Sequence, residues 1–485
     1  MQSGFELPIS IPPRNSRERL RSLHRQLRIA ILEGRLQPGL RLPPTRVLAA
    51  EYGVSRNTAV AAYDLLLSEG YLTSRRGSGT YVADVLPKQP ARRAVAAARS
   101  AADRRLNQVW LQPAMPFDPE RASPRFHFNV GVPDISRFPV DVWRRLSVRA
   151  LRAFAKVSAD YDSPHGRPAL RAAIASHVSF ARAVACSAED VIVTAGAQQA
   201  FDLLARILVV PKRTVVALED PGYASLRAAF AAAGARIAPV PVDEQGLIVE
   251  RLPAQAKVIC VTPSHQFPLG AVMSASRRAA LLEFAQRRGA VVIEDDYDAE
   301  FRFGDRPLDA LQTLDRGESV FYVGTFSKSL FPSLRLGFVV APPWAQVALG
   351  AAKQAADGYC ALLAQETLAA FIAEGHLARH VRRMRGVYAA RRKILIDGLR
   401  KDFAKWLQPV PSAAGLHLTA LADRALDLEA LVERARQRDV GISSLRRFEF
   451  DSRAKKRPQG LAFGYGALDE RGIAEGLARL RKLVP

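Results

Sequence analysis

The chain of 485 residues is too long for one ordinary hydrophobic core, so we expect two or three folded units. Its 48% hydrophobic and 24% charged residues are typical of a globular protein in water, and no apolar run reaches the roughly 18 residues that a membrane span needs. The formal charge of +23 favours a polyanionic partner such as nucleic acid, although a proteome-wide excess of arginine would produce the same value.

The start of the chain and its cysteines indicate a compartment. The first residues lack the basic and apolar segments of a signal peptide. Cys186, Cys260 and Cys360 are far apart and form neither a metal-binding spacing nor a disulfide framework. We therefore expect a protein of the reducing cytoplasm, with no bound metal and no membrane partner.

The first 84 residues predict three helices and a β-hairpin. Amphipathic periodicity and capping residues place the helices at 17–34, 45–52 and 55–69. Two short strand patterns follow, at 71–74 and 79–82. The turn between the second and third helices, Gly53-Val54, is typical of a helix-turn-helix.

The first turn of the last helix in such a motif reaches base edges and phosphates in the major groove. Here that turn contains Arg56, which can read guanine, and Asn57, which can read adenine. The basic hairpin tip can enter the adjacent minor groove. The candidate DNA contacts are Arg46, Ser55, Arg56, Asn57, Thr58, Arg75, Arg76 and Gly77. The alternative is a small helical domain with an exposed basic face.

Residues 17–82 resemble a GntR-type winged helix-turn-helix. The resemblance rests on the runs 40–46, 53–58, 69–72 and 77–82. It implies that the chain binds double-stranded promoter DNA, with contacts from Arg46, Arg56, Thr58 and Gly77.

A change of composition divides the chain. Residues 85–124 are rich in alanine, arginine and proline, and they predict a linker with one helix around 92–105. We therefore expect a DNA-binding domain at 1–84 with its core at 17–82, and a second domain at 125–485.

The second domain alternates helical patterns with short β-branched runs. Continuous apolar strands between helices predict a mostly parallel sheet covered on both faces. The predicted strands are 191–193, 215–218, 258–261, 291–293, 320–323 and 336–340. From about residue 370 to 485, helices dominate and a smaller α+β unit closes the chain.

The strand ends carry the groups that a pyridoxal phosphate site needs. Lys328 lies in the run Gly324-Thr325-Phe326-Ser327-Lys328 and can form a Schiff base. The acids at 294–296 end a buried strand, where ligands bind in parallel sheets. A helix opens at Gly196-Ala197-Gln198, and its amides can hold a phosphate together with Arg335, Thr325 and Ser327. Each group alone is more often solvated surface, so the prediction rests on their joint occurrence.

From about residue 126 onward the chain resembles a fold-type I aminotransferase, through the segments 262–268, 294–298 and 325–329. With the winged helix in front, the whole chain resembles a MocR/GabR-type regulator of the GntR superfamily. The implied fold is multidomain: a winged helix-turn-helix (α+β), then an α/β PLP-dependent transferase of fold type I with a small C-terminal α+β subdomain.

The resemblance assigns roles in holding pyridoxal 5'-phosphate. It implies that Lys328 forms the Schiff base, Asp295 pairs with the pyridine nitrogen, Tyr297 meets the ring oxygen, Tyr223 stacks on the ring and Arg335 binds the phosphate. Tyr161 resembles the tyrosine that reaches the phosphate of a neighbouring subunit, which implies a homodimer. His265 is a further cofactor candidate, and its alternative is a satisfied loop histidine.

One position departs from the aminotransferase pattern. Gly460 stands where these enzymes usually carry an arginine for the substrate carboxylate. Arg447 is the candidate effector-binding residue instead, and its alternative is one more solvated arginine.

We therefore expect a transcriptional regulator that senses an amine, an amino acid or pyridoxal phosphate itself, and that retains at most weak transaminase chemistry. The first alternative is an active aminotransferase with an accessory DNA-binding domain. The second is a repressor whose aminotransferase-like domain holds no cofactor.

Overall fold

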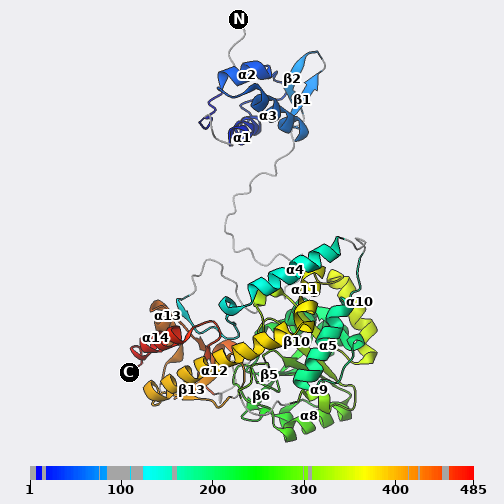
Figure 1. Ribbon diagram of the computed structural model, residues 1–485, viewed down its shortest axis with the longest axis vertical. Coiled ribbons are helices and arrows are strands. Elements are labelled where there is room, and N and C mark those ends of the chain that lie inside the picture. Colours follow the sequence, from blue (N-terminus) through cyan, green and yellow to red (C-terminus); the bar gives the residue numbers. More distant parts are fainter. Residues whose placement is uncertain are drawn as a thin grey trace. The chain divides into compact units, whose positions relative to one another are not determined.

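The computed structural model of the protein describes residues 7–13, 18–75, 77–84, 110, 124–155, 161–298, 300–303, 309–412, 414–423, 426–450 and 458–484. The chain divides into two compact units, Met1–Asp103 and Arg104–Pro485 (Figure 1). This division falls inside the predicted linker, which stays a prediction because most of it, including the helix expected at 92–105, lies outside the described residues. No helix in the described ranges is long and apolar enough to cross a bilayer.

The N-terminal unit contains the three predicted helices and the hairpin. They are α1 (Arg19–Leu32), α2 (Thr45–Glu51), α3 (Arg56–Ser68), β1 (Leu72–Arg75) and β2 (Gly79–Val82). Leu23 and Leu27 of α1 are fully buried with Ala59 and Leu66 of α3, so these two helices share one core. The strands pair antiparallel from Leu72↔Val82 to Arg75↔Gly79, as a wing does.

An eight-stranded sheet forms the centre of the C-terminal unit. Its order is β4-β11-β10-β9-β8-β5-β6-β7, and its strands are parallel except β11 and β7. The bounds are β4 (Val191–Thr194), β5 (Val215–Asp220), β6 (Arg236–Asp243), β7 (Gly246–Leu247), β8 (Ala256–Val261), β9 (Val291–Asp296), β10 (Val320–Thr325) and β11 (Gly337–Val340). All six predicted strands are confirmed, and β6 and β7 are additional.

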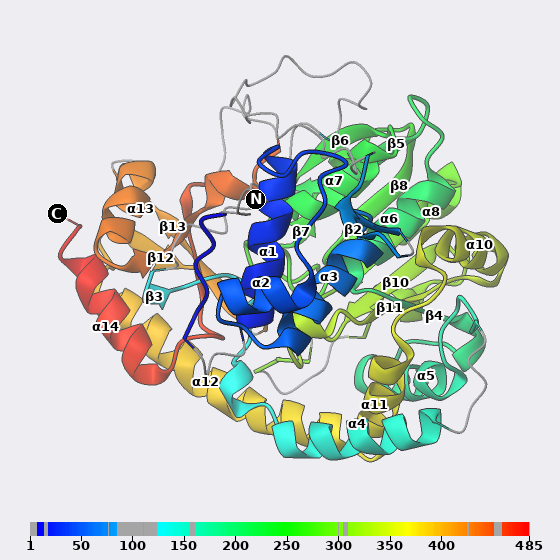
Figure 2. The same ribbon diagram turned by 90° about the horizontal axis from the view of Figure 1, so that it is seen from above.

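Helices cover both faces of this sheet. They are α4 (Val140–Phe154), α5 (Pro168–Arg182), α6 (Ala197–Leu208), α7 (Ala224–Ala232), α8 (Ala275–Arg288), α9 (Leu311–Leu314), α10 (Gln346–Asp357) and α11 (Leu362–Ala373). On one face, Val216 packs with α6 and α7, and on the other Ala217 packs with α8. This explains why both faces of the strands are apolar. At one side, α11 packs against α4 and α5 (Figure 2).

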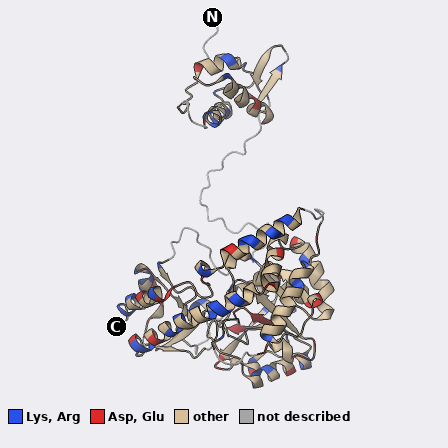
Figure 3. Ribbon diagram, in the orientation of Figure 1, with Lys and Arg blue, Asp and Glu red and all other residues tan. Residues whose placement is uncertain are grey.

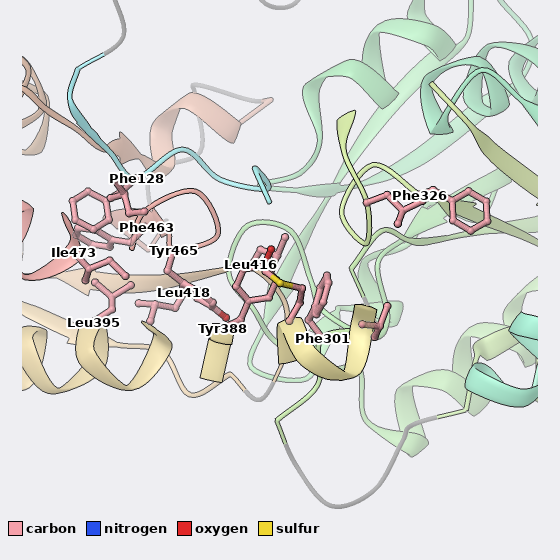
Figure 4. Packing of buried hydrophobic residues seen from close by; sticks show 14 of the residues in the cluster. Phe128, Phe301, Phe326, Tyr388, Leu395, Leu416, Leu418, Phe463, Tyr465 and Ile473 are labelled. Atoms are coloured by element: carbon pink, nitrogen blue, oxygen red, sulfur yellow. The ribbon is translucent and has the colours of Figure 1, made fainter. Parts of the chain in front are cut away.

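A smaller α+β unit closes the chain, as predicted. It contains α12 (His376–Asp402), α13 (Leu428–Gln437), α14 (Glu470–Arg481), and a sheet of β12 (Leu407–Pro409), β13 (His417–Ala422), β16 (Gly460–Gly464) and β15 (Ser443–Ser444). Lys and Arg are frequent along α12 (Figure 3). The core of this α+β unit contains Phe128 and Phe463, whose ring centroids lie 5.6 Å apart edge to face (Figure 4). Phe128 follows β3 (Phe126–His127), which pairs with β14 (Val440–Gly441).

Candidate functional site

The first turn of α3 presents polar groups to solvent. Ser55 caps the helix, because its hydroxyl accepts a hydrogen bond from the Thr58 amide at 3.1 Å. Arg56 and Asn57 are exposed at this turn, and Arg46 is exposed on α2. Within the described ranges, neither arginine forms an ion pair, so both guanidinium groups are available to phosphates or bases.

The tip of the hairpin is partly engaged within the unit. The Arg75 guanidinium lies 4.8 Å from the centre of the Tyr81 ring and 3.7 Å from the Asp84 carboxylate. Gly77 is exposed with φ of +75°, a conformation that favours glycine and keeps the tip narrow. Arg76 lies outside the described residues.

Lys328 follows the end of β10, and its amine lies over the backbone of Gly131. A β-carbon at Gly131 would be 2.9 Å from the Lys328 Nζ, so only glycine leaves the amine its place. Burial lowers the pKa of the Lys328 amine, while Asp298 and Asp295 partly oppose this. A lowered pKa increases the fraction of free amine, the nucleophilic form that a Schiff base requires.

Asp295 is the penultimate residue of β9 and is 5% exposed. Burial, reinforced by the charge of Asp296, raises the pKa of its carboxyl to about 8. Its Oδ1 atom is buried and has no hydrogen-bond partner among the described residues. A buried oxygen without a partner needs an explanation, and a pyridine nitrogen would supply one.

The turn before α6 forms a cradle for an anion. Gly196 has φ of +78° and precedes the helix N-terminus, whose free amides favour negative charge. A β-carbon there would lie 3.1–3.2 Å from the Arg335 guanidinium, which donates to the Ala195 carbonyl at 2.7 Å. The hydroxyl of Thr325 donates to that of Ser327 at 2.9 Å in the loop of Lys328. Ala197 and Gln198 begin α6, and the buried Gln198 Oε1 has no partner in the described ranges.

Tyr223 lies beside the same site. Its ring centre is 5.8 Å from Phe267 and 6.4 Å from Phe201, edge to face in both cases. Tyr223, Phe267 and Asp295 border one small cavity, so the tyrosine ring and the carboxyl of Asp295 face a shared space.

His265 is buried and hydrogen-bonded, which is compatible both with a role at the cofactor and with the alternative of a satisfied loop histidine. Its Nδ1 is 3.1 Å from both carboxylate oxygens of Asp298 and 3.0 Å from the Tyr297 hydroxyl. The ring of His417, from β13, lies 4.7 Å away between centroids. Asp298 and His417 were not among the predicted site residues. Asp298 follows the predicted acidic strand end, whereas nothing in the sequence pattern indicates His417.

Two of the predicted site residues, Tyr161 and Arg447, are exposed. Tyr161 is 95% exposed, and its ring centre is 6.5 Å from Tyr359. Arg447 is exposed on the 3-10 turn Leu445–Phe448. That turn contacts the cofactor region, because the Gly222 amide donates to the Phe448 carbonyl at 2.9 Å and Phe448 packs on Phe267.

Gly460 has no space for a side chain. A β-carbon there would lie 2.4 Å from the Ala420 carbonyl oxygen and 3.1 Å from the Leu445 side chain. An arginine in place of Gly460 therefore does not fit this backbone.

The donors and acceptors fit pyridoxal phosphate. An amine, an unpartnered carboxyl oxygen, an aromatic ring and an anion cradle occur together at the carboxyl ends of parallel strands. Each group matches one part of the cofactor: aldehyde, pyridine nitrogen, ring face and phosphate.

Comparisons with known proteins agree with this geometry. Residues 126–455 match aminotransferase class I and II, and residues 21–82 match the gntR family of bacterial regulatory proteins. The chain is 42% identical over 466 residues to the probable rhizopine catabolism regulatory protein MocR of Rhizobium meliloti, covering 95% of this chain and 92% of that relative. It is 32% identical to the HTH-type pyridoxine biosynthesis transcriptional regulator PdxR of Corynebacterium glutamicum, with 99% of each chain covered. A solved α-aminoadipate aminotransferase from Thermus thermophilus, complexed with N-(5'-phosphopyridoxyl)-L-leucine, has a TM-score of 0.66 and 30% identity, covering 74% of this chain and 91% of that one.

Proposed function

This chain belongs to the MocR-type regulators, which join a GntR DNA-binding domain to an aminotransferase domain, and on that premise we propose that it controls transcription according to what occupies its cofactor site. It binds promoter DNA and pyridoxal phosphate. The observation that carries the proposal is the unpartnered Oδ1 of the buried Asp295, beside Lys328, in a chain that also has an exposed recognition turn on α3.

The residues of the site have separate roles in this proposal. When bound, pyridoxal phosphate supplies an aldehyde and an electron-withdrawing ring. The Lys328 amine would bond to the aldehyde carbon, whose oxygen leaves as water, and the Asp295 carboxyl would hold a proton at the pyridine nitrogen. Arg335 and the amides after Gly196 would bind the phosphate, and Tyr223 would pack on the ring.

The effector in this proposal is an amine, an amino acid or pyridoxal phosphate itself. The names of two relatives mention rhizopine catabolism and pyridoxine biosynthesis, so the regulated process differs within the group. The closed packing around Gly460 supports a site without an arginine at that position. A carboxylate-bearing effector would then need Arg447, whose turn contacts the cofactor region through Phe448.

We further propose that the chain forms a homodimer in the cytoplasm. Supporting this, α4 exposes Val140, Val148, Leu151 and Phe154, a row of apolar side chains that is unusual on a free surface. Tyr161 is almost fully exposed, as a residue that serves a partner's site would be.

Binding to the DNA upstream of the chain's own gene tests the proposal. Fluorescence anisotropy with the full-length protein should show specific binding that changes when pyridoxal phosphate or an active amine is added. Binding that is equal on unrelated DNA, or that no occupant of the site alters, would contradict the proposal.

The set of Lys328, Asp295, Tyr297 and Arg335 also supports a second candidate, an active aminotransferase. Multiple turnovers with an amino donor and a keto-acid acceptor would favour that function. Single-turnover chemistry coupled to altered DNA binding would favour the regulator.

A further inference from the structure

Three chain segments bring Asp298, His265, Tyr297 and His417 together beside Lys328. We propose that His265, held by Asp298, is a positioning residue for the Tyr297 phenol, and that it thereby governs the protonation state of the linkage between Lys328 and the cofactor. This inference rests on the attachment to Lys328 proposed above.

The hydrogen bonds of His265 identify where its proton lies. Both carboxylate oxygens of Asp298 are 3.1 Å from Nδ1, and an ionised carboxylate only accepts, so Nδ1 carries the hydrogen. The Leu416 amide donates to Asp298 Oδ2 at 3.3 Å and helps to fix the carboxylate. The buried Nε2 has no partner within the described ranges, so a second proton there would be an unpaired buried donor. The contacts with Asp298 therefore place a hydrogen of His265 on Nδ1.

The same Nδ1 hydrogen faces the Tyr297 phenol. The phenol oxygen is 3.0 Å from Nδ1, and the Tyr297 hydroxyl donates to the His265 carbonyl oxygen at 3.0 Å. Burial raises the pKa of Tyr297 well above its usual value, so the phenol keeps its hydrogen and remains a donor. A hydroxyl that accepts one hydrogen bond donates another more strongly. His265 thus strengthens Tyr297 as a donor, and the phenol hydrogen, which points to the His265 carbonyl here, would turn to an acceptor bound in the site.

The imidazole of His265 cannot turn away. A β-carbon at Gly415 would lie 2.2 Å from its Cε1 atom, so the ring fills the space that this glycine leaves. His417 packs on it and donates through Nε2 to the Pro268 carbonyl at 3.1 Å, and burial lowers the pKa of His417 to about 3. His417 is therefore a neutral ring that packs against His265. The charged and titratable groups that face this cluster are Glu219, Asp295, Asp296, Asp298, Lys328, His417 and Tyr465.

The effect on the linkage has a definite sign. A phenol that donates to the cofactor's ring oxygen withdraws electron density from an atom that would otherwise help to hold the linkage proton. A weaker donor lets that proton bind more tightly. Losing the His265 donor should therefore raise the pH at which the linkage deprotonates.

The test is a pH titration of the near-visible absorption of the full-length protein with cofactor bound. His265→Phe keeps a ring but removes the donor, and we expect its midpoint to rise by about one pH unit, the ordinary size of such environmental shifts. His265→Asn retains a side-chain N–H and should recover part of the wild-type midpoint. In a Tyr297→Phe background, His265→Phe should cause little further shift, because the proposed effect passes through the phenol, whereas a direct effect of Asp298 on the Lys328 amine would appear in both backgrounds.

Thr419→Val is the matched control. The Thr419 hydroxyl donates to the same Pro268 carbonyl at 2.7 Å and is fully buried, but it has no bond to Tyr297. Its midpoint should equal that of wild type. If His265→Phe shifts the titration midpoint equally with and without Tyr297, this inference is wrong, while the attachment to Lys328 still stands. No near-visible band in wild type overturns the Lys328 attachment and this inference together. If His265→Phe does not fold, His265→Asn in the two backgrounds gives the same comparison.

Discussion

Burial and the charge of Asp296 raise the pKa of the Asp295 carboxyl to about 8, which favours its protonated form at neutral pH. The site therefore already holds the proton that a pyridine nitrogen needs. Binding replaces an unsatisfied buried oxygen with a paired one, which favours occupancy.

At Lys328, we predict the attachment point. Lys328→Ala should abolish the near-visible band and the adduct that borohydride traps on the protein, because no other amine of the described residues takes this position over Gly131. Mass spectrometry of the reduced, digested protein checks this. An adduct of unchanged yield in Lys328→Ala would rule out Lys328.

At Arg447, we predict a role that depends on the effector. If the effector is an amino acid, Arg447→Ala should impair the spectral response to it and leave the cofactor bound, because a carboxylate is held best by a bidentate guanidinium. Arg446, exposed on the same turn, supplies the control Arg446→Ala. The measurement is a spectral titration with an amino-acid panel. No response in wild type would favour pyridoxal phosphate as the effector.

The sequence predicted single residues unevenly. Asp295 lies near the end of β9, Lys328 follows β10, and Arg335 precedes the antiparallel β11, so all three lie at one edge of the sheet and their positions could be inferred. The pairing of His265 with Asp298 spans 33 residues. The contact of His265 with His417 depends on how the small subdomain meets the large one. Periodicity contains no information on such contacts.

At the scale of elements, the buried strands were predictable because both of their faces are apolar. The strand β6 was missed for a physical reason. It contains Pro239 and Pro241, and Val240 is its only fully buried residue. A partly polar strand with two prolines does not produce a continuous β-branched run.

The recognition helix α3 gives a prediction for DNA. Arg56→Ala should weaken specific operator binding by about 1–3 kcal/mol if Arg56 reads a base. Affinity should fall steeply with salt, because phosphate contacts release counterions, and the cofactor band should not change. Arg21→Ala, which removes an exposed arginine from α1, is the control. Anisotropy with specific and mutated operators provides the measurement, and wild-type affinity in Arg56→Ala would contradict this role of α3.

For the whole molecule, Asp295 makes the ligand-free stability pH-dependent. Its pKa rises from 3.8 to about 8 on folding, so the folded chain binds this proton more tightly than the unfolded chain. This contribution is complete below the unfolded value and is lost as pH rises through the folded value. Thermal unfolding should therefore show stability falling between about pH 4 and about pH 8, and falling less in Asp295→Asn.

Glu219 and Glu294 also have pKa values raised by burial, to about 7 in each case. Wild type and Asp295→Asn therefore both keep part of the dependence of stability on pH. The difference between them isolates Asp295. Parallel curves for wild type and Asp295→Asn would show that this carboxyl does not titrate as described.

The pairing of β3 with β14 has a mechanical consequence. The Phe126 amide donates to the Asp439 carbonyl at 2.9 Å, and the Phe128 amide donates to the Gly441 carbonyl at 2.7 Å. The chain that arrives from the predicted linker is thus joined by its backbone to the small subdomain, and not to the large sheet. Any displacement of that subdomain would therefore move β3 with it, through backbone hydrogen bonds and without a side-chain relay.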